Sequence, residues 1–255
     1  SLYVYRVGGM DSLQTGIWAT TSIDDYLNNT IRRHELTRKE TEAGLIDYLQ
    51  QTGIDANPVL ITYQRNERIN AIIDSTTSQT ADLQLTIGDQ QHWLWQIRDA
   101  DKLNDLVHAF AQMPVSYIAD GHHRAAAACS AGIERRKQNL KHHGEEEYNF
   151  FNSVYMATDQ LRIYEFHRLI TDLGGHSAET FFSQLEAHFI VTESDTLVKP
   201  SIAHQFGMYL DKKWYQLRAR NHTYLADNPA DRLDAWILER VILSPLLGVT
   251  DARTD

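Results

Sequence analysis

The feature that most constrains the fold of this chain is a polar run, Asp120 to Arg124, set between two apolar segments. The residues before it, 114–119, have the composition of a buried strand, and the four alanines at 125–128 favour a closely packed helix that continues to about Arg136. A strand that enters a helix through a glycine leaves the first N–H groups of the helix without partners inside it, at the positive end of the helix dipole. The run therefore predicts a phosphate-binding turn.

Each residue type of this turn suits an anion. Gly121 lets the backbone approach a ligand closely because it has no Cβ atom. His122, His123 and Arg124 add N–H donors for phosphate oxygens. Asp120, at the end of the strand, is a candidate to bind a metal ion, to orient His122 or to act as a base. The alternative interpretation is a plain turn whose histidines are solvated.

Strand-like and helical segments alternate without an internal repeat, which predicts an α+β fold with mixed sheets and packed helices. Thr37 and Glu40 have the spacing of a capping box, so we expect a helix to begin there and to end near Gly53. The other segments expected in the first part are strands at 2–7, 14–22 and 59–63, helices at 24–31, 65–75 and 99–113, and a hairpin of 82–87 with 92–97.

The charged segment 137–147 predicts a surface loop in which His142 and His143 are solvated. Beyond it we expect a hairpin of 150–156 with 161–166, a helix at 177–187, strands near 188–192, 206–210 and 214–219, and a last helix from Pro229 to about Leu243. We therefore divide the chain into a phosphate-binding core, residues 1–148, and a second α+β portion, residues 149–255. Both ends are abrupt, so we expect both termini to be truncated from a longer protein.

Composition excludes several classes of protein. The 34 acidic and 24 basic residues give a net charge of −10, which argues against nucleic acid as a partner because nonspecific binding needs basic surface. No apolar run approaches the roughly 18 residues of a membrane span and no signal peptide is present, so we expect a cytoplasmic protein with no membrane partner. A single cysteine, Cys129, leaves no intrachain disulfide and no multi-cysteine zinc site, and we expect it to pack as a small core residue.

Common catalytic motifs are also excluded. The run from His34 to Arg38 resembles the start of a zinc protease motif, but position 38 is arginine where the second histidine ligand is required. The chain contains neither the glycine-lysine run of a P-loop nor the three-glycine fingerprint of a dinucleotide-binding fold. We expect no metal site built from protein ligands alone.

The order of a His-Glu pair, a helix, an apolar strand and an Asp-Gly-His-His-Arg turn resembles the ParB/sulfiredoxin superfamily, and within it the ParB-like free serine kinases. Nearly the whole chain also resembles a large bacterial family described only as a domain of unknown function. The stretches that carry this second resemblance are Gln14–Gly16, Asp24–Leu27, His34–Arg38, Pro58–Val59, Asp120–Arg124, Leu161–Ile163 and Asp251–Asp255. His122 occupies the place of the sulfiredoxin cysteine and no helix-turn-helix follows, so neither sulfiredoxin nor full ParB activity is expected.

The kinase resemblance implies a core of the ParB/sulfiredoxin type and a division of roles. The turn would hold the nucleotide phosphates, Glu35 would be the catalytic base with Asp120 beside it, and His34 and Arg33 would bind substrate. We therefore expect a small-molecule kinase that transfers phosphate from ATP or ADP, with Mg²⁺, to the hydroxyl of a free amino acid, first of all L-serine. The alternative is a non-catalytic regulatory module that binds a nucleotide or another anion. A kinase needs Glu35 near the turn, whereas a binding module does not.

Overall fold

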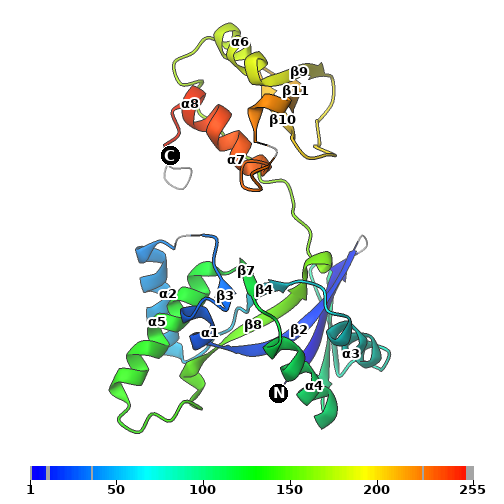
Figure 1. The fold of residues 1–255 in the computed structure, drawn as a ribbon, viewed down its shortest axis with the longest axis vertical. Coiled ribbons are helices and arrows are strands. Elements are labelled where there is room, and N and C mark those ends of the chain that lie inside the picture. The colour runs from blue at the N-terminus through cyan, green and yellow to red at the C-terminus, as the bar shows by residue number, and fades with distance from the viewer. Residues whose placement is uncertain (1, 10–11, 36, 226, 251–255) are drawn as a thin grey trace. The chain divides into compact units, whose positions relative to one another are not determined.

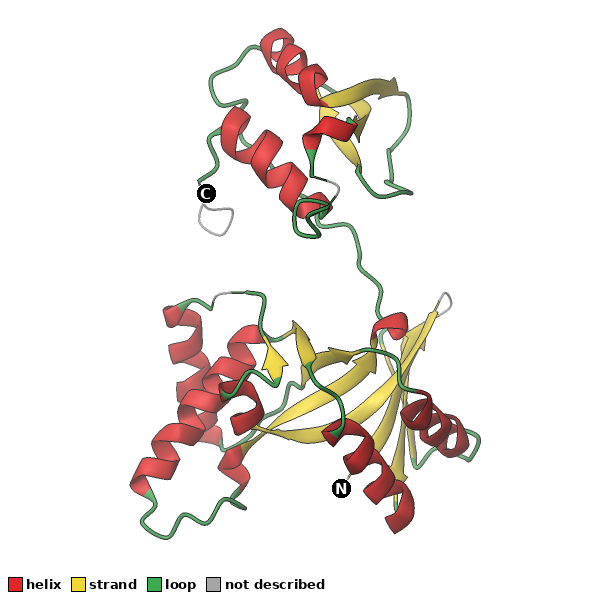
Figure 2. Ribbon diagram, in the orientation of Figure 1, coloured by secondary structure: helices red, strands yellow, loops and turns green. Residues whose placement is uncertain are grey.

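The computed structural model describes residues 2–9, 12–35, 37–225 and 227–250, so the stretch Asp251–Asp255 that contributed to the family resemblance lies outside the described residues. The chain divides into two compact units, Ser1–Tyr164 and Glu165–Asp255. Each unit combines helices with a β-sheet, as Figures 1 and 2 show. The predicted α+β class, with a mixed multi-stranded sheet and packed helices, is confirmed.

Unit 1 is built on a mixed sheet that has eight strands within the described part of the chain, in the order β3-β7-β4-β8-β2-β1-β6-β5. Neighbouring strands are antiparallel except in two pairs, β3 with β7 and β4 with β8, which are parallel. The strands are β1 (Leu2–Gly9), β2 (Ser12–Ser22), β3 (Ile31–Arg32), β4 (Val59–Tyr63), β5 (Leu83–Ile87), β6 (Gln90–Ile97), β7 (Ser116–Asp120) and β8 (Phe150–Ala157). The hairpin expected around Gly88 is confirmed as β5 and β6.

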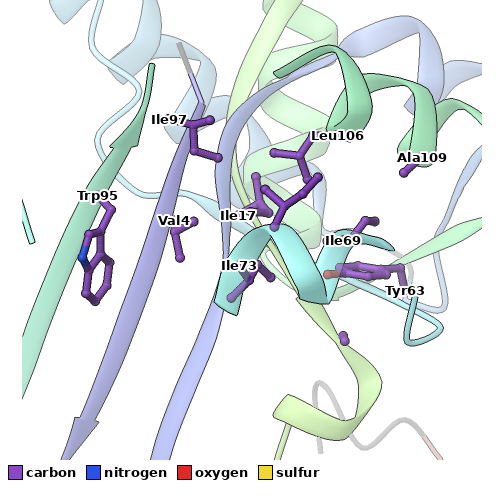
Figure 3. Packing of buried hydrophobic residues seen from close by; sticks show 11 residues of the cluster. Val4, Ile17, Tyr63, Ile69, Ile73, Trp95, Ile97, Leu106 and Ala109 are labelled. Atoms are coloured by element: carbon purple, nitrogen blue, oxygen red, sulfur yellow. The ribbon is translucent and has the colours of Figure 1, made fainter. Parts of the chain in front are cut away.

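One hydrophobic cluster lies between this sheet and the helices α3 (Glu67–Thr77) and α4 (Ala100–Ala111). Both helices begin where a side chain accepts hydrogen bonds from their first free N–H groups, Asn66 for α3 and Asp99 for α4. Apolar residues at helical spacing then face the strands, and Figure 3 shows Ile69 and Leu106 packed beside Ile17 of β2. Burial of these side chains stabilises the half of the sheet that ends in β6 and β5.

A second cluster packs the helices α1 (Ile23–Leu27) and α5 (His122–Gln138) onto β3, β4, β7 and β8, while α2 (Lys39–Thr52) lies against α5 (Figure 1). The alanines of α5 permit this close approach. Ala125 is fully buried, and Cys129 is buried against the same strands, as expected of a small core residue. Burial raises the pKa of the Cys129 thiol to about 12, so it remains protonated and unreactive.

The predicted capping box at Thr37 is wrong. The helix α2 begins at Lys39 with Arg38 as its N-cap, and no side chain of the N-cap residue bonds to the first turn. The Thr37 hydroxyl donates instead to the Glu42 carboxylate. Thr37 and Glu40 have the right spacing, but the helix begins at Lys39. Thr37 is therefore not the N-cap residue, and the reciprocal bonds of a capping box cannot form.

The predicted hairpin of 150–156 with 161–166 is also wrong in its second strand. Residues 161–170 form neither helix nor strand. The physical reason is that β8 already has a neighbour on each side, β4 and β2, so its edges have no free backbone groups for a hairpin partner.

The same strand order changes the boundary between the two parts of the chain. We expected it between residues 148 and 149, but β8 is a central strand of the first sheet and unit 1 continues to Tyr164.

Unit 2 contains a small antiparallel sheet, in the order β10-β11-β9 among the described residues, with its own hydrophobic cluster. Its elements are α6 (Ala178–His188), β9 (Phe189–Ser194), β10 (Gln205–Leu210), β11 (Lys213–Ala219), α7 (Asp234–Leu238), a π-helical turn (Glu239–Leu243) and α8 (Ser244–Leu247). The last helix therefore begins later than the expected Pro229. In neither unit is a described helix long and apolar enough to cross a membrane.

Candidate functional site

The candidate site forms where two parallel strands end side by side. The short strand β3 pairs in parallel with β7, with Ile31 opposite Ser116 and Arg32 opposite Tyr117. Because parallel strands run in the same direction, the residues that follow β3 and those that follow β7 emerge at the same edge of the sheet. Glu35 and Gly121, far apart in the sequence, are brought to one place in this way.

The turn after β7 passes from strand to helix through a single glycine. Gly121 has a φ of 94°, in the left-handed region that favours glycine, and α5 begins at the next residue, His122. The N-cap makes no side-chain hydrogen bond, and the first turn of α5 contains no acidic residue. This 17-residue helix therefore begins with N–H groups that lack partners within the helix, and no acidic residue of the helix itself lies in its first turn. In proteins generally, a helix N-terminus is a favourable place for an anion.

Arg124 holds the turn in shape. Its guanidinium donates to the Asp120 carboxylate at 2.5 Å and to the backbone carbonyl of Pro58, just before β4, also at 2.5 Å. A Cβ atom on Gly121 would come within 3.0 Å of this guanidinium. Asp120 is thus paired with Arg124, and among the described residues no hydrogen bond from Asp120 to His122 supports the first of its alternative roles, to orient that histidine. Arginine has five N–H donors, so Arg124 keeps donors for a ligand.

His122 is a buried side chain, which removes the interpretation that both histidines of the turn are solvated. Its side chain is 3% exposed, its Nδ1 lies 3.5 Å from Glu35 Oε2, and its ring meets the His34 ring edge-on at 4.4 Å between centroids. Its Nε2 has no hydrogen-bond partner among the described residues. Burial, and then the charge of the neighbouring His34, lower the pKa of His122 below its usual value of about 6.5, so the ring is neutral at neutral pH.

His123 faces a different neighbour. Its Nε2 accepts a hydrogen bond of 3.0 Å from the backbone N–H of Arg38, the N-cap of α2. The two histidines therefore contact the chain between β3 and α2 at different points, His122 at Glu35 and His123 at Arg38. The turn is attached to the Glu35 region by both of its histidines.

Glu35 lies at the rim of an open pocket beside the turn. The Glu35 side chain is 52% exposed, which leaves its carboxylate accessible to a ligand. Arg33 donates from Nη1 to the Tyr26 hydroxyl at 3.3 Å and lies over the Tyr26 ring, with 4.6 Å from Cζ to the ring centroid. The pocket has a volume of about 850 Å³ and is lined by Tyr26, Asn28, Asn29, Arg32, Arg33, His34, Glu35 and Thr37.

The structure thus brings together Arg33, His34 and Glu35 on one side and the turn on the other. Sequence reasoning missed Tyr26, Asn28 and Asn29 as pocket residues. Tyr26 belonged to a stretch that matched the family resemblance, but nothing in its local pattern separates a pocket tyrosine from a core tyrosine. The described residues include no group of three or more histidine, cysteine, aspartate or glutamate side chains that could hold a metal ion.

Replacing Gly121 with alanine should destabilise unit 1 and weaken anion binding. The left-handed conformation costs an alanine about 1–2 kcal/mol, and the new methyl group would also push against the Arg124 guanidinium. Gly53→Ala is the matched control, because Gly53 has a φ of 67° but open space around its Cβ position. Urea unfolding and a phosphate titration should show a larger loss for Gly121→Ala in both. If Gly121→Ala and Gly53→Ala lost the same stability, and Gly121→Ala bound phosphate as the natural protein does, the role of Arg124 in shaping the turn would be contradicted.

The lowered pKa of His122 predicts the pH dependence of stability. The unfolded chain binds a proton at this histidine before the folded chain does, so the stabilisation is complete above about pH 6.5 and is lost as the pH falls below that value. We expect the unfolding free energy of His122→Leu to fall less between about pH 7.5 and 5 than that of the natural protein. The exposed histidine His108 supplies the control, since His108→Leu should keep the natural slope. Equal slopes for all three proteins would exclude a buried neutral His122.

Comparison with known proteins supports the second resemblance found in the sequence. A family model described as "Protein of unknown function (DUF1015)" matches residues 1–236, most of the chain. No curated protein and no solved structure gives a match.

Proposed function

The chain belongs to the DUF1015 family, and we propose that it is a small-molecule kinase that transfers phosphate from a nucleotide, ATP or ADP, to the hydroxyl of a free amino acid, with L-serine as the first acceptor to test. The observation that carries the proposal is the parallel pairing of β3 with β7, which places Glu35 beside the N-terminus of α5. A carboxylate next to an anion-binding helix end supplies the two groups that a kinase of this kind needs.

The phosphate groups of the nucleotide bind at the turn. The backbone N–H groups that open α5 point at them, and Gly121 leaves room for their approach. Arg124, fixed by Asp120 and the Pro58 carbonyl, adds a positive charge whose remaining donors suit phosphate oxygens. This arrangement supports a core of the ParB/sulfiredoxin type, in which a comparable turn holds the nucleotide.

Glu35 is the base. Its carboxylate accepts the proton of the acceptor hydroxyl while the acceptor oxygen bonds to the terminal phosphorus of the nucleotide. The bond from that phosphorus to its bridging oxygen breaks, and the shortened nucleotide leaves with the electron pair. His122 is neutral and its Nδ1 lies 3.5 Å from Glu35 Oε2, so it contacts the carboxylate without cancelling its charge.

The pocket beside Glu35 receives the acceptor. Arg32 and Arg33 line this pocket, and a guanidinium binds the carboxylate of an amino acid in a bidentate way. Arg33 is held in place by the Tyr26 hydroxyl and ring, which reduces the entropy that it loses on binding. His34 lies between this pocket and His122. An amino acid whose carboxylate meets Arg33 would present its hydroxyl toward Glu35.

Mg²⁺ fits this site only as a companion of the nucleotide. The described residues form no cluster of three metal ligands, but Mg²⁺ usually keeps its waters and binds substrate phosphates with one or two carboxylates. Asp120, at the turn, is the carboxylate that would hold it. When bound, the ion would neutralise charge on the phosphate groups.

The second candidate function is a regulatory module that binds a nucleotide or another anion without catalysis. The observation that favours it is the 52% exposure of the Glu35 side chain at the rim of an open pocket, where the carboxylate need not take part in a reaction. The anion-binding end of α5 would be the same in both functions. The two differ in what Glu35 does.

The proposal is tested by incubating the protein with L-serine, Mg²⁺ and either ATP or ADP, and measuring O-phosphoserine by mass spectrometry. Product with one donor supports the kinase, and L-threonine and glycerol show whether the pocket selects an amino acid. If a nucleotide binds but no product forms with either donor and any acceptor, the regulatory module is the better description.

A further inference from the structure

We propose that the His123 imidazole is a positioning residue that ties the chain around Glu35 to the turn through the backbone N–H of Arg38. The sequence suggested a phosphate ligand at His123, but the contact found in the structure is different. The bond to Arg38 stands on its own geometry, and only its effect on catalysis rests on the proposed kinase function.

The hydrogen bond determines the state of the ring. His123 Nε2 accepts from the Arg38 N–H at 3.0 Å, and a ring nitrogen that accepts carries no proton. The ring is therefore neutral in this state, and Nε2 cannot donate to a phosphate oxygen. The proton of the ring is then on Nδ1, and Arg124 is the residue of the turn whose side chain keeps a positive charge for a phosphate.

The chain that carries Glu35 needs such a contact. It runs from the end of β3 at Arg32 to the start of α2 at Lys39, and Arg33, His34 and Glu35 are all exposed. The helix that follows, α2, packs against α5 but has no buried residue. Exposed residues such as Arg33, His34 and Glu35 sample several positions unless other groups hold them.

Glu35 lies between two contacts to the rest of unit 1. On one side Arg33 binds the hydroxyl and ring of Tyr26 in α1, and on the other Arg38 binds His123 in α5. His123 is next in sequence to His122, which faces Glu35 itself. The hydrogen bond of His123 therefore sets the distance between the catalytic carboxylate and the helix end that would hold the phosphates.

The test compares two variants of the full chain that differ in one property. His123→Gln keeps an oxygen that can accept from Arg38, and His123→Met keeps a side chain of similar length with no strong acceptor. His108→Met, at an exposed histidine of α4, is the control for the substitution itself. Hydrogen exchange of the Arg38 amide and the rate of trypsin cleavage after Arg38 measure the contact without any need for activity.

We expect the Arg38 amide to exchange about tenfold faster in His123→Met, with faster trypsin cleavage, and to stay near the natural rate in His123→Gln. Unchanged exchange and cleavage in His123→Met would overturn the proposal, whether or not the protein is a kinase. With kinase activity present, kcat should fall in His123→Met, recover in His123→Gln and leave the KM for the nucleotide unchanged. A rise in nucleotide KM in both variants, with kcat unchanged, would make His123 a phosphate ligand and overturn the positioning role.

Discussion

Replacing Glu35 with glutamine should lower the kcat for phosphoryl transfer about 10²- to 10⁴-fold, the usual contribution of a positioned general base. Glutamine has nearly the same shape and can keep a contact with His122 Nδ1, which lies 3.5 Å from the carboxylate. It cannot take up the proton of the acceptor hydroxyl. Nucleotide affinity should stay unchanged, because the backbone N–H groups of α5 and Arg124 are untouched. Steady-state kinetics and a nucleotide titration measure the two quantities separately.

The control for this substitution is Glu40→Gln, in the first turn of α2. It makes the same chemical change a few residues away, at an exposed side chain that the proposed reaction does not use, so kcat should remain natural. Equal rates for Glu35→Gln and the natural protein would exclude Glu35 as the base. A loss of nucleotide binding in Glu35→Gln would instead indicate that this side chain supports the phosphate site.

The turn could be predicted from sequence because its physics is local. A glycine at the end of an apolar strand permits a left-handed φ, and the helix that follows exposes its own N–H groups whatever the rest of the chain does. Local chemistry was less informative about where the helix starts. It begins at His122, three residues before the alanines that indicated it, so both histidines lie in its first turn.

The partner of the turn could not be found in the same way. Glu35 reaches it because Ile31 and Arg32 pair with β7, and a strand of two residues is too short to show an alternating pattern. The resemblance to a known superfamily, not periodicity, placed Glu35 near the turn in advance. The role of Tyr26 in the pocket could not be predicted for a related reason, since its contact with Arg33 depends on how α1 packs beside β3.

The same non-local pairing explains the error in the division of the chain. Residues 150–157 read correctly as a strand, but their neighbours were expected in the sequence that follows. In the structure β8 lies parallel to β4 and antiparallel to β2, both of which come much earlier in the chain. Hydrophobic alternation shows that a strand has a buried face, but it does not show which strands lie beside it. The choice of partner is therefore set by packing of the whole unit.

Because β8 is a central strand of unit 1, Phe151→Ala in this strand should lower the free energy of unfolding of the unit by about 3–5 kcal/mol. Phe151 is 1% exposed and packs in the cluster formed by β4, β7 and α5, so its removal leaves a cavity under the helix that carries the turn. Phe150, the residue before it, is 38% exposed and is the matched control. Phe150→Ala should cost much less, because it leaves no buried cavity.

The measurement must separate the two units, since each has its own hydrophobic cluster and a single unfolding midpoint would mix them. Hydrogen exchange across a urea series, followed in peptides from β8 and from β11, reports each unit by itself. Phe151→Ala should shift the β8 peptide to lower urea and leave the β11 peptide, which belongs to unit 2, unchanged. If residues after 148 belonged to the second portion of the chain, the β11 peptide would shift and the peptides of β4 would not. Loss of protection in β4 and β8 together, with β11 unaffected, is the result that the order of strands in the sheet requires.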